Sequence, residues 1–364
     1  MTDHRDVESP ENEGHQDPQA SGGRESDQEK IRRYREQVEA RAAEELEGLM
    51  ADSDEKKSEI DSAFVRECLM LNQLGDGKLY AAMQRGKFAY NKSTKEWMTF
   101  NGHHWEIDEM DLSSAACERI VERYREEALI IGKEMNELPD DDPNRARLGK
   151  LKKKLWERVS ALRGDRRDRC LKWAHTNDDP LSVHGKMFDT NPWLLPCPNG
   201  VIDLQTGEFR DGRPGDYLLK ACRTPWKGPD ERNEDFEKAL MEIMSGREDV
   251  YLFLQRLLGS ALIGEDIEHI FVMATGRGRN GKDTLFETIQ HVLGDLAGVI
   301  PPEMLLQQAS RISPNSPTPD IMAMKGLRYA IASETDEHAR FSPGRVKWLT
   351  GGGTLTGRWP NDKY

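Results

Sequence analysis

The residues best suited to chemistry lie in a glycine-rich segment, TGRGRNGKDT, at positions 275–284. It contains the spacing G-x-x-x-x-G-K, in which glycines let successive backbone N–H groups converge on phosphate oxygens. Lys282 would then reach the β- and γ-phosphates of a nucleoside triphosphate. The predicted nucleotide-binding residues are Gly276, Arg277, Gly278, Arg279, Asn280, Gly281, Lys282, Asp283 and Thr284.

Two flanking elements must position this loop. Residues 269–274 (HIFVMA) are apolar and predict a short β-strand, and residues 285–294 (LFETIQHVLG) predict a helix. A helix at this place presents its positive N-terminal end to a bound phosphate. The order strand, loop, helix therefore favours a P-loop over the alternative, a glycine-rich turn that binds no ligand.

Asp283 departs from the usual pattern, in which Ser or Thr follows the lysine and its hydroxyl binds Mg²⁺. The carboxylate could bind the ion directly or through water, although it adds negative charge beside the phosphates. Alternatively, Thr284 supplies the hydroxyl after a small shift. A third interpretation is a site that binds nucleotide without hydrolysing it.

A second candidate site follows the apolar run LRYAIA at 327–332, which predicts another strand. Glu334 and Asp336 come directly after it. Acidic residues at a strand end downstream of a P-loop can hold Mg²⁺ and polarise the attacking water. Alone they would be a solvated turn, but with the P-loop upstream we expect a function. The predicted catalytic residues are Lys282, Glu334 and Asp336, and the predicted Mg²⁺ ligands are Asp283, Thr284 and Glu334.

Charge and composition define three regions. Residues 1–60 carry 18 acidic and 9 basic side chains, and thus −9 of the net charge of −13, so the remaining chain is only weakly acidic and nucleic acid is not excluded. Residues 1–29 have almost no apolar content and predict disorder, and 30–60 predict a solvated helix. We therefore expect an acidic segment at 1–60, an α+β domain at 61–230 and a P-loop domain at 231–364.

Within the middle region, 63–74 predicts an amphipathic helix and 86–108 a β-hairpin or meander. Residues 111–175 predict helices interrupted by a turn at 138–144, and 186–227 predict short strands. The basic run 150–169 could contact DNA. Because three acidic residues are interspersed, a solvated helix face is the favoured interpretation.

The five cysteines form no C-x-x-C pair and are odd in number, which indicates neither a disulfide framework nor a zinc site and favours a reducing compartment. There is no apolar run of about 18 residues, so no membrane partner is expected. The N-terminus has no hydrophobic region typical of a secretory signal. A cytoplasmic location is the expectation.

Several motifs together resemble the phage/plasmid and poxvirus-type primase-helicases of helicase superfamily 3. The resemblance covers about residues 70–364, with Gly353 standing where that family usually has Asp. The matching segments are Trp97-x2-Phe100-x-Gly102-x2-Trp105, NGVIDLQTGE at 199–208, FLQRLLGSALIG at 253–264, the loop at 276–282, Ala332-Ser333-Glu334, and KWLTGGGTLTGR at 347–358.

This resemblance implies an α/β P-loop NTPase, an AAA+-like superfamily 3 helicase core, preceded by an α+β accessory domain. It implies an ATP-dependent DNA helicase that uses ATP and Mg²⁺ and translocates on single-stranded DNA as a hexameric ring. A primase or replication-initiation partner and a prophage origin in a bacterial host cell would fit. Lys347, Arg358 and Lys363 are the predicted DNA contacts.

The family continues beyond the LTGG segment with a sensor strand and an arginine finger, so the chain, ending at Tyr364, is expected to be a truncated core. One alternative is a weak or inactive remnant that binds nucleotide or DNA. Another, a small-molecule phosphotransferase, would need an arginine-rich lid after the P-loop. Residues 301–320 contain one arginine and many turn formers, which disfavours it.

Overall fold

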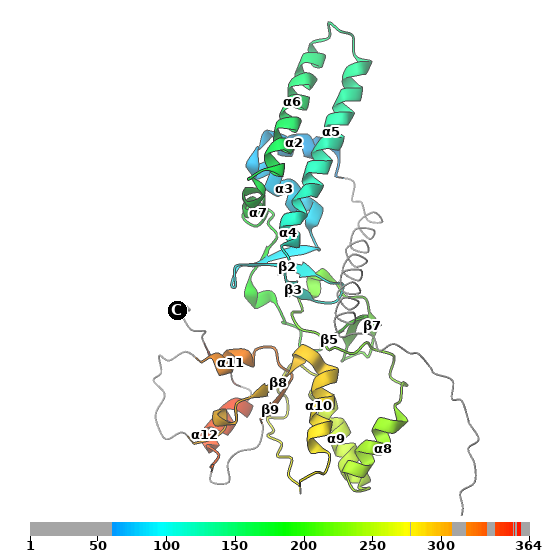
Figure 1. The fold of residues 1–364 in the computed structure, drawn as a ribbon, viewed down its shortest axis with the longest axis vertical. Helices are drawn as coiled ribbons and strands as arrows, with labels where there is room; N and C mark the ends of the chain where they lie inside the picture. Colours follow the sequence, from blue (N-terminus) through cyan, green and yellow to red (C-terminus); the bar gives the residue numbers. More distant parts are fainter. Residues whose placement is uncertain are drawn as a thin grey trace, which may run out of the picture. The chain divides into compact units, whose positions relative to one another are not determined.

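The structure, a computed structural model, describes residues 60–276, 278–307, 318–332, 339–351, 353 and 355–357. Helices and strands are mixed along this part of the chain (Figure 1). No described helix is long and apolar enough to cross a lipid bilayer. The disorder and the helix predicted for the first 59 residues lie outside the described part.

One amphipathic helix is predicted over 63–74, but the structure has two. The predicted helix is therefore present but is interrupted. Asp61 begins the first helix by accepting a hydrogen bond from the Phe64 N–H at 2.7 Å. Asn72 has a positive φ of 56°, which no α-helix allows, and this interrupts the run. The two helices are α2 (Ser62–Met70) and α3 (Gln73–Gln84).

The meander predicted over 86–108 is confirmed as three antiparallel strands. A fourth strand, far along the chain, pairs in parallel with the first, which gives the sheet order β3-β2-β1-β4. Trp105 is buried in the sheet's core and donates from Nε1 to the Pro214 carbonyl at 2.9 Å. The strands are β1 (Phe88–Asn91), β2 (Glu96–Phe100), β3 (Trp105–Ile107) and β4 (Ser182–Val183).

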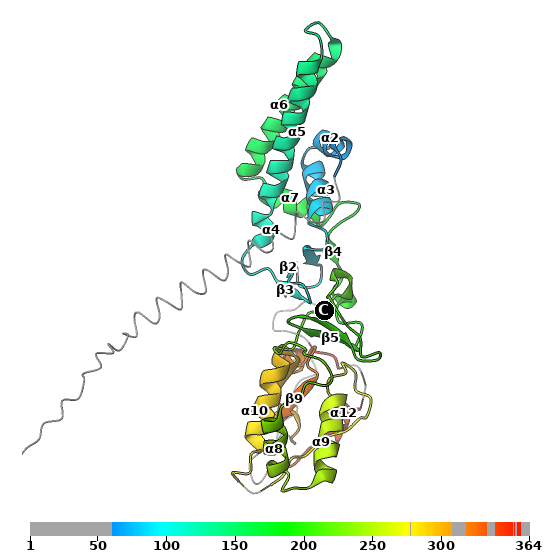
Figure 2. The same cartoon turned by 90° about the vertical axis from the view of Figure 1, so that its right-hand side faces the viewer.

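The helices predicted over 111–175 are also confirmed. Two long helices pack side by side as an antiparallel hairpin (Figures 1 and 2). The turn between them ends where the Asp142 side chain accepts from the Asn144 N–H at 2.7 Å and Pro143 occupies the first helical turn. The helices are α4 (Leu112–Ala115), α5 (Cys117–Glu137), α6 (Pro143–Arg163) and α7 (Arg167–Ala174).

A three-stranded antiparallel sheet, in the order β5-β6-β7, confirms the short strands predicted in 186–227. Gly200 approaches the next strand so closely that a Cβ there would lie 2.6 Å from the Arg210 carbonyl oxygen. Arg210 in turn donates twice to the Asp216 carboxylate, at 2.8 Å each. The elements are η1 (Gly185–Met187), β5 (Leu194–Cys197), β6 (Gly200–Asp203), β7 (Phe209–Arg210) and η2 (Pro214–Asp216).

Helix α10 lies at the centre of a second core. Its buried residues Leu285, Ile289 and Leu293 share a core with β5, β6 and α8. The last two strands, β8 and β9, pair in parallel over their full length. The elements are α8 (Glu234–Ile243), α9 (Glu248–Ser260), α10 (Lys282–Leu293), η3 (Gly294–Leu296), β8 (Ala297–Ile300), η4 (Pro302–Met304), α11 (Pro319–Ala323), β9 (Tyr329–Ala332) and α12 (Pro343–Thr350).

Candidate nucleotide-binding site

The glycine-rich loop ends at the start of α10, as its sequence predicts. Gly281 is the N-cap and has left-handed backbone angles, φ 80° and ψ 5°. A Cβ on Gly281 would lie 2.7 Å from Cγ1 of Ile243, at the end of α8, so both the backbone angle and the packing exclude a side chain. Lys282 is therefore held at the first position of the helix.

Asn280 closes the loop from inside. A Cβ on Gly276 would lie 2.1 Å from Asn280 Nδ2. Asn280 Oδ1 accepts from the Lys282 backbone N–H at 3.5 Å and from its ammonium at 3.4 Å. The Asn280 amide thus contacts both Gly276, at one end of the loop, and Lys282, at the other.

The first turn of α10 supplies further groups for an anion. The first intrahelical bond joins the Leu285 N–H to the Gly281 carbonyl at 3.0 Å. The N–H groups of a helix's first turn have no acceptor within the helix and carry the positive end of its dipole. Asp283 and Thr284 are exposed on this turn. The arrangement can bind a phosphate-sized anion through backbone and ammonium groups together.

Other predicted loop residues contribute less to this geometry. Gly278 has room for a side chain, because a Cβ added there would meet no atom within 4 Å apart from its chain neighbours. Arg279 is exposed and has a positive φ of 61°, an uncommon backbone angle for a residue with a side chain. Arg277 lies outside the described residues.

The helix α10 is positioned by an apolar face that its sequence predicts. Leu285, Ile289 and Leu293 recur at i, i+4 and i+8, and all three are buried. They pack against Leu195 and Ile202 of the β5–β6 hairpin, among others. The loop is therefore anchored on one side by a hairpin some 80 residues earlier in the chain.

The strand predicted over 269–274 is not formed, and this prediction is wrong. Residues 269–276 belong to no strand, and Met273 is 59% exposed. A strand needs a neighbour to accept its hydrogen bonds, and among the described residues β9 pairs only with β8. The Phe271 ring instead meets Phe341 edge-on, at 5.7 Å between centroids.

The strand predicted over 327–332 is confirmed as β9, which begins at Tyr329. The two acidic residues expected after it, Glu334 and Asp336, lie outside the described residues. Lys347 is exposed on α12, whereas Arg358 and Lys363 also lie outside the described part. The structure thus brings together the loop residues, and of the predicted carboxylates and DNA contacts it describes Lys347.

Arg328, directly before β9, has a role that the sequence motifs did not predict. It donates to the carbonyls of Leu194, at 2.5 Å, and of Leu262. Burial lowers the pKa of its guanidinium from the ordinary value. The sequence does contain a signal for this role, since Arg328 is a single cation within an apolar run. A buried cation needs hydrogen-bond partners.

Comparison with known proteins relates part of this chain to viral replication proteins. Residues 77–245 match the family model described as "D5 N terminal like", which ends before the glycine-rich loop. The chain is 32% identical over 173 residues to a protein named "Putative helicase" from Acanthamoeba polyphaga mimivirus, covering 47% of this chain and 18% of the relative.

Two further relatives point the same way. A "Putative helicase" of Invertebrate iridescent virus 3 is 26% identical over 183 residues, covering 46% of this chain and 18% of the relative. A "Putative primase" of African swine fever virus is 27% identical over 183 residues, covering 48% and 19%. The chain thus spans less than a fifth of the length of these relatives. The matches support a D5-like primase-helicase relationship for the earlier part of the described chain.

Proposed function

We propose that this chain is the ATPase module of an ATP-dependent DNA helicase belonging to a phage- or plasmid-type replication primase-helicase. The observation that supports the proposal most is the loop before α10. Gly281 has a left-handed backbone packed against Ile243, and it sets Lys282 at the head of the helix. The relatives named as helicases and primases support a role in DNA replication.

In this proposal the backbone N–H groups of the loop and of the first turn of α10 bind the phosphates of ATP. The close approach of the Asn280 amide to Gly276 leaves no room for a side chain at position 276. Lys282 neutralises charge that develops on the transferred phosphoryl group, and Glu334 orients or deprotonates the attacking water, assisted by Asp336.

Asp283, Thr284 and Glu334 are the residues proposed to hold Mg²⁺, directly or through water. When bound, the ion would neutralise phosphate charge as the phosphoryl group is transferred. Asp283 and Thr284 offer a carboxylate and a hydroxyl on the exposed first turn of α10, both oxygen ligands of the kind Mg²⁺ prefers.

The wider proposal concerns assembly and DNA. Hydrolysis would drive translocation of a hexameric ring on single-stranded DNA, gripped by Lys347, Arg358 and Lys363 through a salt-dependent, sequence-independent contact. The expected setting is the cytoplasm of a bacterial host, with a separate primase or replication-initiation protein as partner.

A second candidate function is a nucleotide- and DNA-binding module without turnover. The observation that favours it is Asp283, which stands at the second position of α10, where it adds a negative charge to the turn that would face the phosphates. Asp283 also stands where a Ser or Thr hydroxyl usually binds Mg²⁺, so its presence would impair the metal-dependent phosphoryl transfer while the loop still binds phosphate.

The two candidates separate in one series of measurements. Binding of a fluorescent ATP analogue is titrated with and without Mg²⁺, and phosphate release is then followed with single-stranded DNA present. Lys282→Ala should weaken binding at least tenfold, because it removes the ammonium group that lies beside Asn280 in the loop and would bind the phosphates. The matched control is Lys133→Ala, an exposed lysine on α5.

Unchanged affinity in Lys282→Ala would rule out both candidates. Binding that depends on Lys282 without phosphate release would select the second, and DNA-stimulated release that is lost in Glu334→Gln would select the first.

A further inference from the structure

The segment from α6 to the end of α7 carries a local excess of positive charge. Residues 143–174 contain 12 Lys and Arg side chains and 3 Asp and Glu, in a chain whose net charge is −13. The sequence favoured a solvated helix face because acidic residues are interspersed. In the structure, nine of these twelve cations fall into two groups with different surroundings.

The cations of the first group bind carbonyl or carboxylate groups of neighbouring helices or lie against them. Arg145 donates to the Met135 and Leu138 carbonyls at 2.9 Å each and so caps the end of α5. Arg163 binds the Glu118 carboxylate at 2.6 Å, and Arg167 binds it at 3.3 Å. These cations have partners within the protein.

Two more cations of this first group point into the helical region. Arg158 is buried, and its Nε donates to Asp76 Oδ1 at 3.2 Å, beside the Tyr124 hydroxyl. The Lys152 ammonium lies over Gly132 of α5, 3.1 Å from where a Cβ would stand.

The second group lies on the outer face of α6. These four cations are exposed, and none of them forms an ion pair with a described carboxylate. Their spacing of three and four residues places them on one side of the helix. We call this set the α6 basic face; its residues are Arg147, Lys150, Lys153 and Lys154.

The acidic residues that argued for simple solvation are mostly elsewhere. Asp165 and Asp168 come after α6 has ended at Arg163. Among the described residues of α6, Glu157 is the one carboxylate. Glu157 is exposed and lies three residues after Lys154 and four after Lys153, so the α6 basic face carries four cations beside one carboxylate and keeps a net positive charge.

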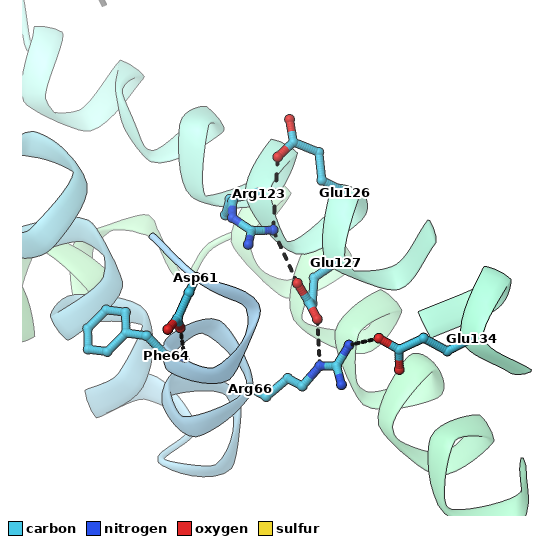
Figure 3. A network of polar contacts seen from close by, with 7 residues as sticks. All are labelled: Asp61, Phe64, Arg66, Arg123, Glu126, Glu127 and Glu134. Carbon is cyan, nitrogen blue, oxygen red and sulfur yellow. Dashed lines mark hydrogen bonds and ion pairs between the residues drawn. The ribbon is translucent and has the colours of Figure 1, made fainter. Parts of the chain in front are cut away.

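Three carboxylates of the neighbouring helix α5 bind cations outside the α6 basic face. Glu127 is fully buried and binds Arg66 of α2 at 2.6 Å, and Arg66 binds Glu134 at 2.6 Å as well (Figure 3). Arg123 reaches Glu127 at 3.3 Å and Glu126 at 4.0 Å. Glu127 and Glu134 of α5 therefore bind a cation of α2, while Glu118 binds Arg163, which is not part of the α6 basic face.

An aromatic ring adjoins the α6 basic face. Trp156 is 43% exposed and follows Lys153 by three residues, so the two side chains are neighbours on the helix surface. An exposed indole beside lysines is the combination that binds single strands, with a base stacked on the ring and phosphates on the cations.

We propose that the α6 basic face and Trp156 bind single-stranded DNA through its phosphodiester backbone and one stacked base. The choice of DNA as the partner rests on the proposed function, but the contact needs no nucleotide and no ring. The surface is distinct from the predicted contacts on and after α12.

The test measures binding of a fluorescent oligonucleotide to the full chain by anisotropy between 50 and 200 mM salt, without ATP. Lys150→Gln, Lys153→Gln and Lys154→Gln combined should weaken binding about 10- to 100-fold. The slope of log affinity against log salt should fall by about 2, at roughly 0.7 per lost phosphate contact.

The matched control removes the same charge where the cations are already paired. Lys227, Arg232 and Arg247 bind Glu231, Glu237 and Asp249. Changing all three to Gln should leave the slope within about 0.5 of the parent. An equal loss in both triple variants would overturn the proposal in favour of a general charge effect.

Trp156→Ala should weaken single-strand binding about fivefold or more, Trp156→Phe should restore most of it, and a duplex of the same sequence should respond little to either change. Binding of duplex alone, or of anionic lipid vesicles with no binding of DNA, would also overturn the proposal. ATP binding measured on the same proteins is read separately: its absence would contradict the proposed ATPase while leaving this DNA contact standing.

Discussion

The glycines of the loop differ in what surrounds them, although in sequence they are equivalent members of one motif. Gly281 is confined by a positive φ and by the Ile243 side chain, whereas a Cβ on Gly278 would meet no atom within 4 Å apart from its chain neighbours. Gly276 faces the Asn280 amide. The spacing of the motif alone cannot predict which glycine tolerates a side chain least. That depends on a neighbour, Ile243, which lies 38 residues earlier in the chain.

Gly281→Ala should therefore destabilise the fold by about 1–3 kcal/mol, from left-handed strain and overpacking against Ile243. Gly278→Ala is the matched control and should change stability by less than about 0.5 kcal/mol. Chemical denaturation with a constant m-value measures both. Equal stability of the two variants would mean that the loop does not pack on α8 as described.

At the scale of elements, the local sequence pattern predicted the helices, strands and turns that depend mainly on neighbouring residues. The helix α10, the meander β1–β3 and the turn into α6 follow from apolar period, turn residues and the Asp142-Pro143 start. The strand expected at 269–274 failed because an apolar run becomes a strand only with a partner, and a partner is a non-local property. Likewise, the basic run had to be folded into a helix before its paired and unpaired cations could be told apart.

The docking of α2 on α5 depends on such a non-local partner, Glu127, whose side chain is 0% exposed. The hydrogen bond to Glu134, together with the one to Glu127, raises the pKa of the Arg66 guanidinium. Glu127→Gln leaves two guanidinium groups without their shared buried charge and should cost about 2–4 kcal/mol of unfolding free energy. Glu126→Gln, at an exposed site with a 4.0 Å contact, should cost less than about 0.5 kcal/mol. Urea denaturation of both variants checks the difference, and similar losses would refute a specific role for the buried carboxylate.

At the scale of the molecule, the region matched by the D5-type family and the region carrying the loop share physical contacts. Leu195 and Ile202, before the predicted boundary at 230, lie in one core with Leu240 and Leu285 after it. The family match itself runs to residue 245. The boundary at 230 stays a prediction about sequence organisation, while the shared core implies that the loop's geometry depends on the β5–β6 hairpin.

Arg328 makes this dependence testable. Its guanidinium joins the start of β9 to the Leu194 carbonyl of β5 and to the Leu262 carbonyl after α9. Arg328→Met keeps the volume but leaves both carbonyls without their donor, which should cost about 2–4 kcal/mol of stability. Arg345→Met is the control, since Arg345 donates to a single exposed carbonyl, that of Glu303, and should cost less than about 0.5 kcal/mol.

Hydrogen exchange should reveal where the stability of Arg328→Met is lost. If Arg328 links the regions, protection falls in β5 and in the first turn of α10 together, and affinity for the ATP analogue falls with it, because the loop is anchored on that core. Loss of protection confined to β9, with unchanged affinity, would instead mean that the loop is positioned by α8 and α10 alone and that the hairpin has no part in nucleotide binding.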